Sequence, residues 1–277
     1  MGKAEEARER AMMIARRLLR LMALFGLDPR MFVRSVRGVG PYFRNRAVLR
    51  AQIVEIGEDA DAFAIGAAQP SLHNRQQQSG ARGSRGYFHQ DLHVAQLIYE
   101  NRPRSHIDVG SRVDGFVTHV ASFRPIEVLD IRPLEIAARN ITFRQCDLMQ
   151  EHPDLDECTD SLSCLHVLEH FGLGRYGDTV DYYGYRRGWE NLYRMLTPGG
   201  KLYFSVPIGP QRIEFDAHRV FSVPFLTSMM DGKYRIDSFA YVDDKGVLIR
   251  DVDPTGSPAQ NSFGCRYGVG IFELTKL

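Results

Sequence analysis

Apolar and polar residues change their rhythm along the chain near Tyr87. Just after it, HQDLHVAQLIYE carries apolar residues at helical spacing. Five apolar runs follow with helical segments between them, and we expect these runs to be strands: His106–Val109, Ile126–Ile131, Ile141–Cys146, Ser161–Leu165 and Lys201–Val206. Strands that alternate with helices predict a mostly parallel sheet covered on both faces. Two later runs, Ser238–Val242 and Tyr267–Leu274, predict an antiparallel edge hairpin, which makes a seven-stranded, Rossmann-like α/β fold.

The part of the chain before this sheet has a different pattern. Lys3–Phe25 predicts one amphipathic helix that packs on the core or on a second subunit; a membrane-surface helix is the alternative, weakened by its early glutamates. Arg30–Gln52 is rich in arginine and predicts short helices, and Gly66–Gly86 is a polar, glycine-rich loop, either a linker or a lid. We therefore expect an N-terminal helical extension with a loop over 1–86 and the main domain over 87–277.

Composition narrows the classes of function. The chain has 277 residues, and its 35 basic and 34 acidic residues predict no general surface for nucleic acids. Its four cysteines form no C-x-x-C pair, which favours a reducing compartment such as the cytoplasm over a disulfide framework. No apolar run reaches the ~20 residues that span a bilayer, and the charged N-terminus is unlike a secretory signal.

Acidic residues end several of the predicted strands. Asp108 closes the first strand and is followed by a turn with Gly110 and Gly115, Asp130 closes the second, and Asp147 closes the third. The carboxyl ends of parallel strands are where such sheets bind ligands, and an acid after the second strand suits ribose hydroxyls. The glycine spacing is not G-x-G-x-x-G, and a strand-to-helix turn without a ligand would look similar.

Longer stretches resemble the class I S-adenosylmethionine-dependent methyltransferases from about Tyr87 to Leu277. These stretches are VLEH, ENLYRMLTPGGKLYFSVP and AHRVFSVPFLTSMM. Three further phrases, DVGSRVDGFVTHVASF, SLSCLHVLEHFGLGRYGD and YFSVPIGPQRIEFDAHRVF, resemble the DUF268 family of methyltransferase-like proteins, often considered alongside surface-polysaccharide enzymes. The resemblance implies that 87–277 is a methyltransferase-like catalytic domain and that S-adenosylmethionine is its cofactor.

The same resemblance implies a cofactor site at the strand ends. The implied cofactor-binding residues are Asp108, Gly110, Ser111, Arg112, Gly115, Asp130, Ile131, Asp147, Leu148 and His166. Asp130 would take the ribose hydroxyls, Asp147 with Leu148 the adenine edge, and His166 would lie near the methyl group. The chain departs from the usual D-x-G-x-G-x-G turn at Arg112, which would either pair with the cofactor carboxylate or fill the site.

Three candidate catalytic residues lie near the fourth strand and beyond the fifth. His170, Glu169 and His218 are these candidates, with His170 or His218 as the general base that takes a hydroxyl proton. If H-x-x-E-H is helical, its side chains share a face and with His218 could hold a divalent metal; the alternative is a metal-free pocket lining. A peptidase is remote, because that motif needs the middle of a long helix.

The resemblance also implies that the segments after strands four and five face the acceptor. Their candidate acceptor residues are Arg175, Tyr176, Asp178, Asp181, Arg212 and Arg219; aromatic rings and acids suit a sugar, and arginines suit a phosphate or carboxylate. The alternatives are an ordinary surface loop with buried tyrosines and, for the two later arginines, surface salt bridges. The favoured function is O-methylation of a small-molecule, sugar or surface-glycan acceptor. The alternatives are a non-catalytic binding or scaffold protein of the same fold, and a metal-assisted O-methyltransferase.

Overall fold

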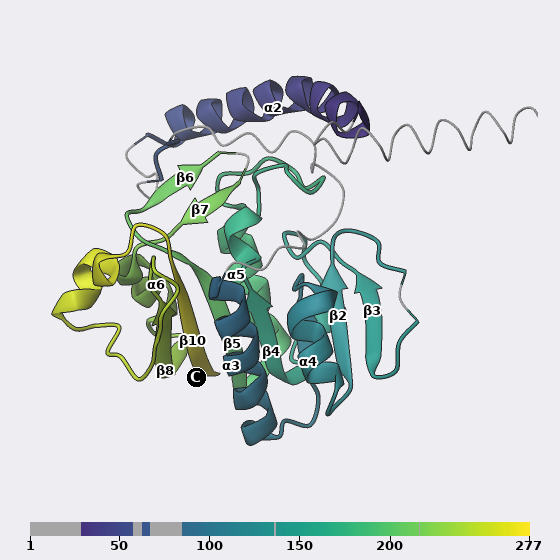
Figure 1. Ribbon diagram of the computed structural model, residues 1–277, viewed down its shortest axis with the longest axis vertical. Coiled ribbons are helices and arrows are strands. Elements are labelled where there is room, and N and C mark those ends of the chain that lie inside the picture. Colours follow the sequence, from purple (N-terminus) through teal and green to yellow (C-terminus); the bar gives the residue numbers. More distant parts are fainter. Residues whose placement is uncertain (1–28, 58–62, 67–84, 136, 216) are drawn as a thin grey trace, which may run out of the picture.

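One twisted sheet organises the molecule in the computed structural model (Figure 1). The described residues are 29–57, 63–66, 85–135, 137–215 and 217–277. The strands of the sheet are β1 (Ile107–Val109), β2 (Ile126–Asp130), β3 (Ile141–Gln145), β4 (Thr159–Leu165), β5 (Leu196–Ile208), β8 (Tyr234–Val242), β9 (Leu248–Ile249) and β10 (Gly268–Lys276). Their order is β3-β2-β1-β4-β5-β10-β8-β9, so the predicted strands are confirmed and the short β9 adds an eighth.

Strand direction divides the sheet into two parts. Strands β1 to β5 are mutually parallel, whereas β10 runs antiparallel between β5 and β8. The chain moves outward from β1 to β3 and then returns to the other side of β1 as β4. This reversal places a topological switch point between β1 and β4, where sheets of this kind bind ligands.

Helices cover both faces of the central strands (Figure 1). The helices of the sheet domain are α3 (Arg85–Asn101), α4 (Thr118–Ala121), α5 (Gly184–Met195) and α6 (Val223–Met230). Apolar residues of α3 and α4, among them Val94 and Val120, join one core, and residues of α5 and α6, among them Trp189 and Leu226, join the other. Trp189 packs α5 against the sheet, with its ring centre 5.0 Å from that of Phe204.

The alternation of strands and helices is less complete than the sequence predicts. Residues 131–140 join β2 to β3 without a helix among their described residues, and a 3-10 turn, Pro153–Leu155, is the helical piece between β3 and β4. The first connection is shorter than the dozen or so residues that a helical crossover uses. Strand β3 is accordingly only partly buried, which leaves that edge of the sheet thinly covered.

The arginine-rich segment forms one helix, α2 (Pro29–Ile56), rather than several short ones. Its inner side is fixed by Tyr42 and Leu49, which belong to the larger core. Asn45 donates to the Gly174 carbonyl at 3.3 Å, and Gln52 donates to the Val180 carbonyl at 3.0 Å. Helix α2 therefore lies against the segment that follows β4. The helix expected over 3–25 and most of the loop expected over 66–86 lie outside the described residues.

A small two-stranded ribbon lies between α2 and the sheet (Figure 1). It consists of β6 (Arg212–Glu214) and β7 (His218–Val220), which pair antiparallel. The ring of Phe215, between these strands, meets the Tyr42 ring of α2 at 5.4 Å. None of the described helices is both long and apolar enough to cross a bilayer.

Candidate cofactor and acceptor site

A pocket of about 510 Å³ opens at the carboxyl ends of β1, β2 and β4. This volume is in the range of small-molecule sites. Ten predicted site residues line it: Gly110, Ser111, Arg112, Asp130, Ile131, Asp147, Leu148, His166, His170 and His218. The other three, Asp108, Gly115 and Glu169, do not reach the pocket wall. The sheet edge thus gathers residues that are far apart in sequence.

Asp108 shapes the turn after β1 from behind. Its buried carboxylate accepts hydrogen bonds from the Ser111 backbone N–H at 2.9 Å, the Ser111 hydroxyl at 2.8 Å and the Ser163 hydroxyl at 2.5 Å. Burial raises the pKa of Asp108 to about 7. Gly110 follows with φ +67°, and a Cβ there would lie 2.8 Å from Cγ1 of Val167. The turn therefore needs glycine, and it brings backbone close to the segment after β4.

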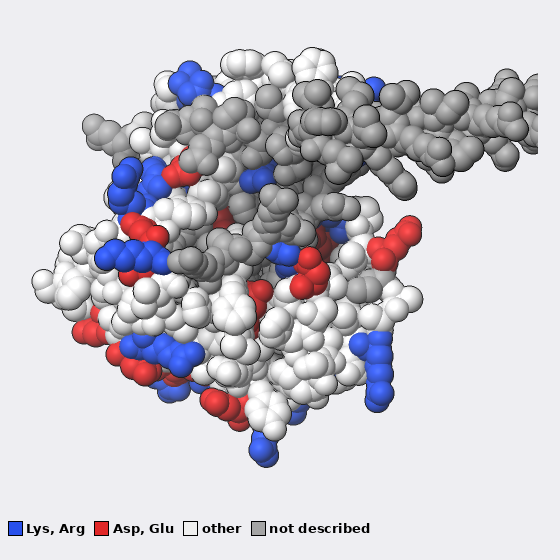
Figure 2. Space-filling model, viewed as in Figure 1, with Lys and Arg blue, Asp and Glu red and all other residues white. Residues whose placement is uncertain are grey.

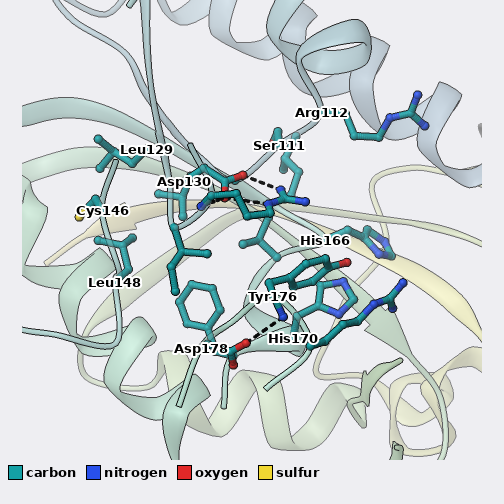
Figure 3. Close-up of a pocket in the computed structure, with 18 of the residues that line it drawn as sticks. Ser111, Arg112, Leu129, Asp130, Cys146, Leu148, His166, His170, Tyr176 and Asp178 are labelled. Carbon is teal, nitrogen blue, oxygen red and sulfur yellow. Dashed lines mark hydrogen bonds and ion pairs between the residues drawn. The ribbon is translucent and has the colours of Figure 1, made fainter. Parts of the chain in front are cut away.

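Arg112, the residue that departs from the usual turn, is paired within the same loop. Its guanidinium donates to both carboxylate oxygens of Asp114, at 3.1 and 2.9 Å. In Figure 3 its side chain points away from Asp130 and Ser111. In this rotamer Arg112 borders the pocket without filling it. Gly115 lies beside the carboxylate of Asp91, because a Cβ there would be 2.8 Å from Asp91 Oδ2.

The acid after β2 is already occupied by a neighbouring arginine. Arg132 donates to Asp130 through its backbone N–H at 2.8 Å, through Nε at 2.9 Å and through a terminal nitrogen at 2.5 Å (Figure 3). The guanidinium carbon lies 4.8 Å from the centre of the Tyr176 ring. Arg132 lines the pocket, so a ribose that bonds Asp130 has to displace or share this guanidinium.

Asp147 and Leu148, which follow β3, contribute both polar and apolar atoms to the pocket wall. Asp147 accepts the Met149 backbone N–H at 2.9 Å, which turns the chain away from β3. Leu148 is held by Asn191, whose side chain donates to the Leu148 carbonyl at 2.8 Å. Ile131 lines the pocket with these residues. Apolar side chains beside a polar edge are suited to a flat, aromatic ligand such as adenine.

The H-x-x-E-H segment forms a tight turn, so the helix considered for it is wrong. His166 leaves β4 with φ +56°, and a single 3-10 turn covers Leu168–His170. His166 Nδ1 lies 3.0 Å from Glu169 Oε1, and His170 Nε2 lies 3.8 Å from the same oxygen. Buried Glu169 therefore orients His166 from behind, whereas its distance to His170 is too long for a hydrogen bond. Within the described residues, the buried His166 Nε2 has no hydrogen-bond partner.

His170 has a defined tautomer. Its Nδ1 lies 2.6 Å from the Ala217 carbonyl oxygen, which can only accept, so Nδ1 carries the hydrogen and Nε2 carries the lone pair. Burial, reinforced by the Arg175 charge, lowers the pKa of His170 to about 3. Burial also lowers the pKa of His218, whose ring centre lies 6.3 Å from that of His170. Both imidazoles are therefore neutral near pH 7.

The described residues contain no group of three or more His, Cys, Asp or Glu side chains arranged to hold a metal ion. The geometry therefore gives no support to a metal held by His166, Glu169, His170 and His218.

The acceptor candidates after β4 divide into two kinds. Arg175 and Tyr176 line the pocket, with the guanidinium carbon 5.2 Å from the ring centre. Asp178 also borders the pocket, but its carboxylate accepts the backbone N–H groups of Gly172, Gly174 and Tyr176 and so closes its own loop. Asp181 pairs with Arg187 at 2.9 Å and lies outside the lining.

The two arginines expected to grip a phosphate or carboxylate are both engaged elsewhere. Arg212 pairs with Glu214 and does not line the pocket. Arg219 is fully buried and donates to the carbonyls of Phe171 at 2.5 Å and Tyr182 at 3.0 Å. Its guanidinium carbon lies 4.9 Å from the Tyr185 ring centre. Arg219 therefore fixes the segment after β4 and cannot reach a ligand.

The structure also adds pocket residues that the sequence reading missed. Tyr87, Gln90 and Asp91 of α3 line the pocket beside the first turn. Burial raises the pKa of Asp91, whose carboxylate accepts a hydrogen bond from Gln90 at 3.0 Å. The helix was expected, but which of its polar residues face the sheet edge depends on how it docks. Arg132 was likewise visible in LDIRP without any signal that it would bond Asp130.

The strand order, with its antiparallel β10 and a pocket at the β1–β4 switch point, defines the class I methyltransferase fold. Residues 124–255 match the family model described as "Caenorhabditis protein of unknown function, DUF268". The expected resemblance to DUF268 is thus confirmed over that stretch, somewhat less than half of the chain. No curated protein matches the chain.

Several solved structures are similar in fold. The N-methyltransferase NodS from Bradyrhizobium japonicum WM9, in complex with S-adenosyl-L-homocysteine, has a TM-score of 0.47 at 14% identity and covers 73% of this chain and 94% of its own. The 1,6-didemethyltoxoflavin-N1-methyltransferase from Burkholderia thailandensis has 0.47 at 13%, covering 68% and 79%. The [4+2]-cyclase SpnF has 0.45 at 14%, covering 81% and 92%. At this low sequence identity and TM-score, the activities in these names belong to those proteins and are not carried over to this chain.

Proposed function

We propose that this protein binds S-adenosylmethionine and transfers its methyl group to a hydroxyl of a sugar or surface-glycan intermediate. The observation that carries the proposal is the pocket itself. It places Asp130 and Asp147 at neighbouring strand ends and puts His166 and His170 beside them on the wall. The bound cofactor would supply an already activated methyl group, so the protein mainly has to align the reactants.

The residues of the pocket fit this cofactor in kind. Asp91, beside the glycine turn, would pair with an ammonium group, and Asp130 would accept hydrogen bonds from ribose hydroxyls once Arg132 yields. Ile131 and Leu148 would flank the adenine. The Gly110 backbone lies against the Val167 side chain, so the first turn is narrow and carries no side chain of its own at this position.

His170 would accept the proton of the acceptor hydroxyl. Its Nε2 carries the lone pair, because Nδ1–H is fixed on the Ala217 carbonyl. Tyr176 and Arg175 would then meet the sugar, one by stacking and the other by hydrogen bonds. Glu169 would act as a positioning residue for His166, and the Ala217 carbonyl would do the same for His170.

Methyl-labelled S-adenosylmethionine with a panel of nucleotide sugars and glycan extracts tests this proposal. We expect the wild type to label a hydroxyl acceptor, and His170→Gln to lower the rate by about a hundredfold or more with unchanged affinity for S-adenosylhomocysteine. His93→Gln is the matched control, since His93 lies on α3 outside the pocket lining. Label transferred to nitrogen or carbon, or an unchanged rate in His170→Gln, would contradict the O-methylation proposal.

One observation favours a second candidate, a non-catalytic binding protein of this fold. Arg132 holds both carboxylate oxygens of Asp130, the acid on which ribose recognition depends. If this pair does not open, the site excludes the cofactor, and the residue responsible is Arg132 rather than Arg112. That candidate predicts no binding of S-adenosylhomocysteine to the wild type and a gain of binding in Arg132→Ala.

A further inference from the structure

Helix α2 exposes an apolar stripe on its outer side. Phe32, Val36, Phe43 and Val54 are 70%, 56%, 62% and 81% exposed, and their separations of four, seven and eleven residues place them along one side of a helix. Eight of the fifteen large hydrophobic residues exposed in the described part of the chain lie on this helix. Among the described elements, the helix forms the outermost layer, beyond the β6–β7 ribbon (Figure 1). An exposed apolar concentration of this kind marks an interaction surface.

The same helix carries most of its charge as arginine. It has six arginines and one acidic residue, Glu55, whereas the whole chain has 35 basic and 34 acidic residues. The exposed arginines are Arg34, Arg37, Arg44 and Arg50. On the face in Figure 2, red and blue side chains are interspersed over the sheet domain, while blue side chains without red lie at the top edge, over α2. The surface of α2 is thus apolar and cationic together.

The placement of the charges distinguishes between occupants. Arg50 falls in line between Phe43 and Val54, in the middle of the apolar stripe. Arginine is common in protein–protein interfaces, but a second copy of α2 would bring six arginines and a single acidic residue against these, so like charges would meet. A layer of anionic lipid headgroups accepts arginine beside inserted phenylalanine, because the long side chain extends its charge outward while its stem stays apolar.

We propose that α2 docks this protein on an anionic phospholipid surface. Phe32 and Phe43 insert between headgroups. Arg50, in line with them, and Arg37 and Arg44, on the flank of the stripe, meet the lipid phosphates and carboxylates. The inner side of α2 remains on the segment after β4 through Asn45 and Gln52, so docking does not require the helix to leave the core. The proposal does not depend on what the pocket binds.

Vesicle co-sedimentation of the full chain tests the proposal. We expect binding to vesicles of phosphatidylcholine with phosphatidylserine, weak binding to phosphatidylcholine alone, and release as salt rises. Phe32→Ser with Phe43→Ser is expected to lower the partition constant at least about tenfold, because two exposed rings lose their apolar burial. Arg37→Gln with Arg44→Gln is expected to lower it by a similar factor on phosphatidylserine vesicles only.

Phe88→Ser with Val247→Ser is the matched control, since both side chains are exposed and lie away from α2. This double variant is expected to bind vesicles like the wild type, and thermal unfolding checks that all variants fold. Wild type that stays in the supernatant with phosphatidylserine vesicles at low salt overturns the proposal. The proposal is also overturned if the phenylalanine variant loses self-association, measured by light scattering, but binds vesicles as the wild type does. If the wild type binds polyglutamate as well as it binds vesicles, and the phenylalanine variant does the same, the partner is an acidic protein instead.

Discussion

Replacing Arg219 by methionine tests whether this arginine is a structural residue. The side chain is fully buried, and it donates to backbone carbonyls of Glu169, Phe171 and Tyr182 without an ion pair to a carboxylate among the described residues. Methionine would fill much of the space but leave these carbonyls without donors. Each buried acceptor left unbonded costs about 1–3 kcal/mol, partly offset because a desolvated charge is removed.

The net expectation is a loss of about 3 kcal/mol in the free energy of unfolding, a large share of the total that a single domain has. Urea unfolding followed by the fluorescence of Trp189, the chain's only tryptophan, gives this value directly. Arg219→Lys keeps the charge but not the planar guanidinium, so its free energy of unfolding is expected to lie between those of the wild type and Arg219→Met.

Arg104→Met is the control for the loss of an arginine as such. Its side chain is 85% exposed, beside Asp160, so we expect a change below about 1 kcal/mol. An Arg219→Met protein that unfolds within about 1 kcal/mol of the wild type would refute the reasoning. It would mean that the segment after β4 does not depend on these hydrogen bonds, and Arg219 would again be open to a role in ligand binding.

Two further predictions concern the first turn and the buried histidines. Gly110→Ala is expected to lower the free energy of unfolding by about 2 kcal/mol or more, because its positive φ and the Val167 side chain both oppose a Cβ. Gly199→Ala, which has a positive φ but open space around it, should lower it less. Equal losses in the two variants would exclude the clash with Val167. Burial lowers the pKa of His106 from 6.5 to about 3. As pH falls below about 6.5, this histidine therefore binds a proton in the unfolded chain but not in the folded state, and the free energy of unfolding decreases. Urea unfolding at about pH 7 and about pH 5 should therefore show less acid destabilisation in His106→Asn, and a slope equal to the wild type's would contradict this.

The sequence was most informative about the sheet and about the positions of the strand ends. The apolar runs predicted β1 to β5. Strands β1 and β4 and the second half of β5 are buried, and a strand buried on both faces has to be largely apolar. Asp130 and Asp147 could be placed in one pocket from this alone, since parallel strands end at the same edge. The described residues between β2 and β3 form no helix, because residues 131–140 are too few for a crossover helix.

What the sequence could not predict was which partner each polar side chain takes. Arg212 and Arg219 lie seven residues apart and look alike in sequence, yet one pairs with Glu214 and the other is buried against the segment after β4. Arg132 reaches Asp130 only because the chain turns sharply after β2. Burial and pairing of this kind are decided by elements distant in sequence, so spacing alone carries no signal for them.

The central claim is that the pocket holds S-adenosylmethionine through Asp130. Calorimetric binding of S-adenosylhomocysteine to wild type, to Asp130→Ala and to the surface control Asp154→Ala tests it most directly, since Asp154 lies outside the pocket lining. We predict micromolar binding to wild type and to the control, and a loss of at least about tenfold in Asp130→Ala, where hydrogen bonds to a charged group disappear. Absence of binding to the wild type, or equal affinity in Asp130→Ala, would contradict the claim.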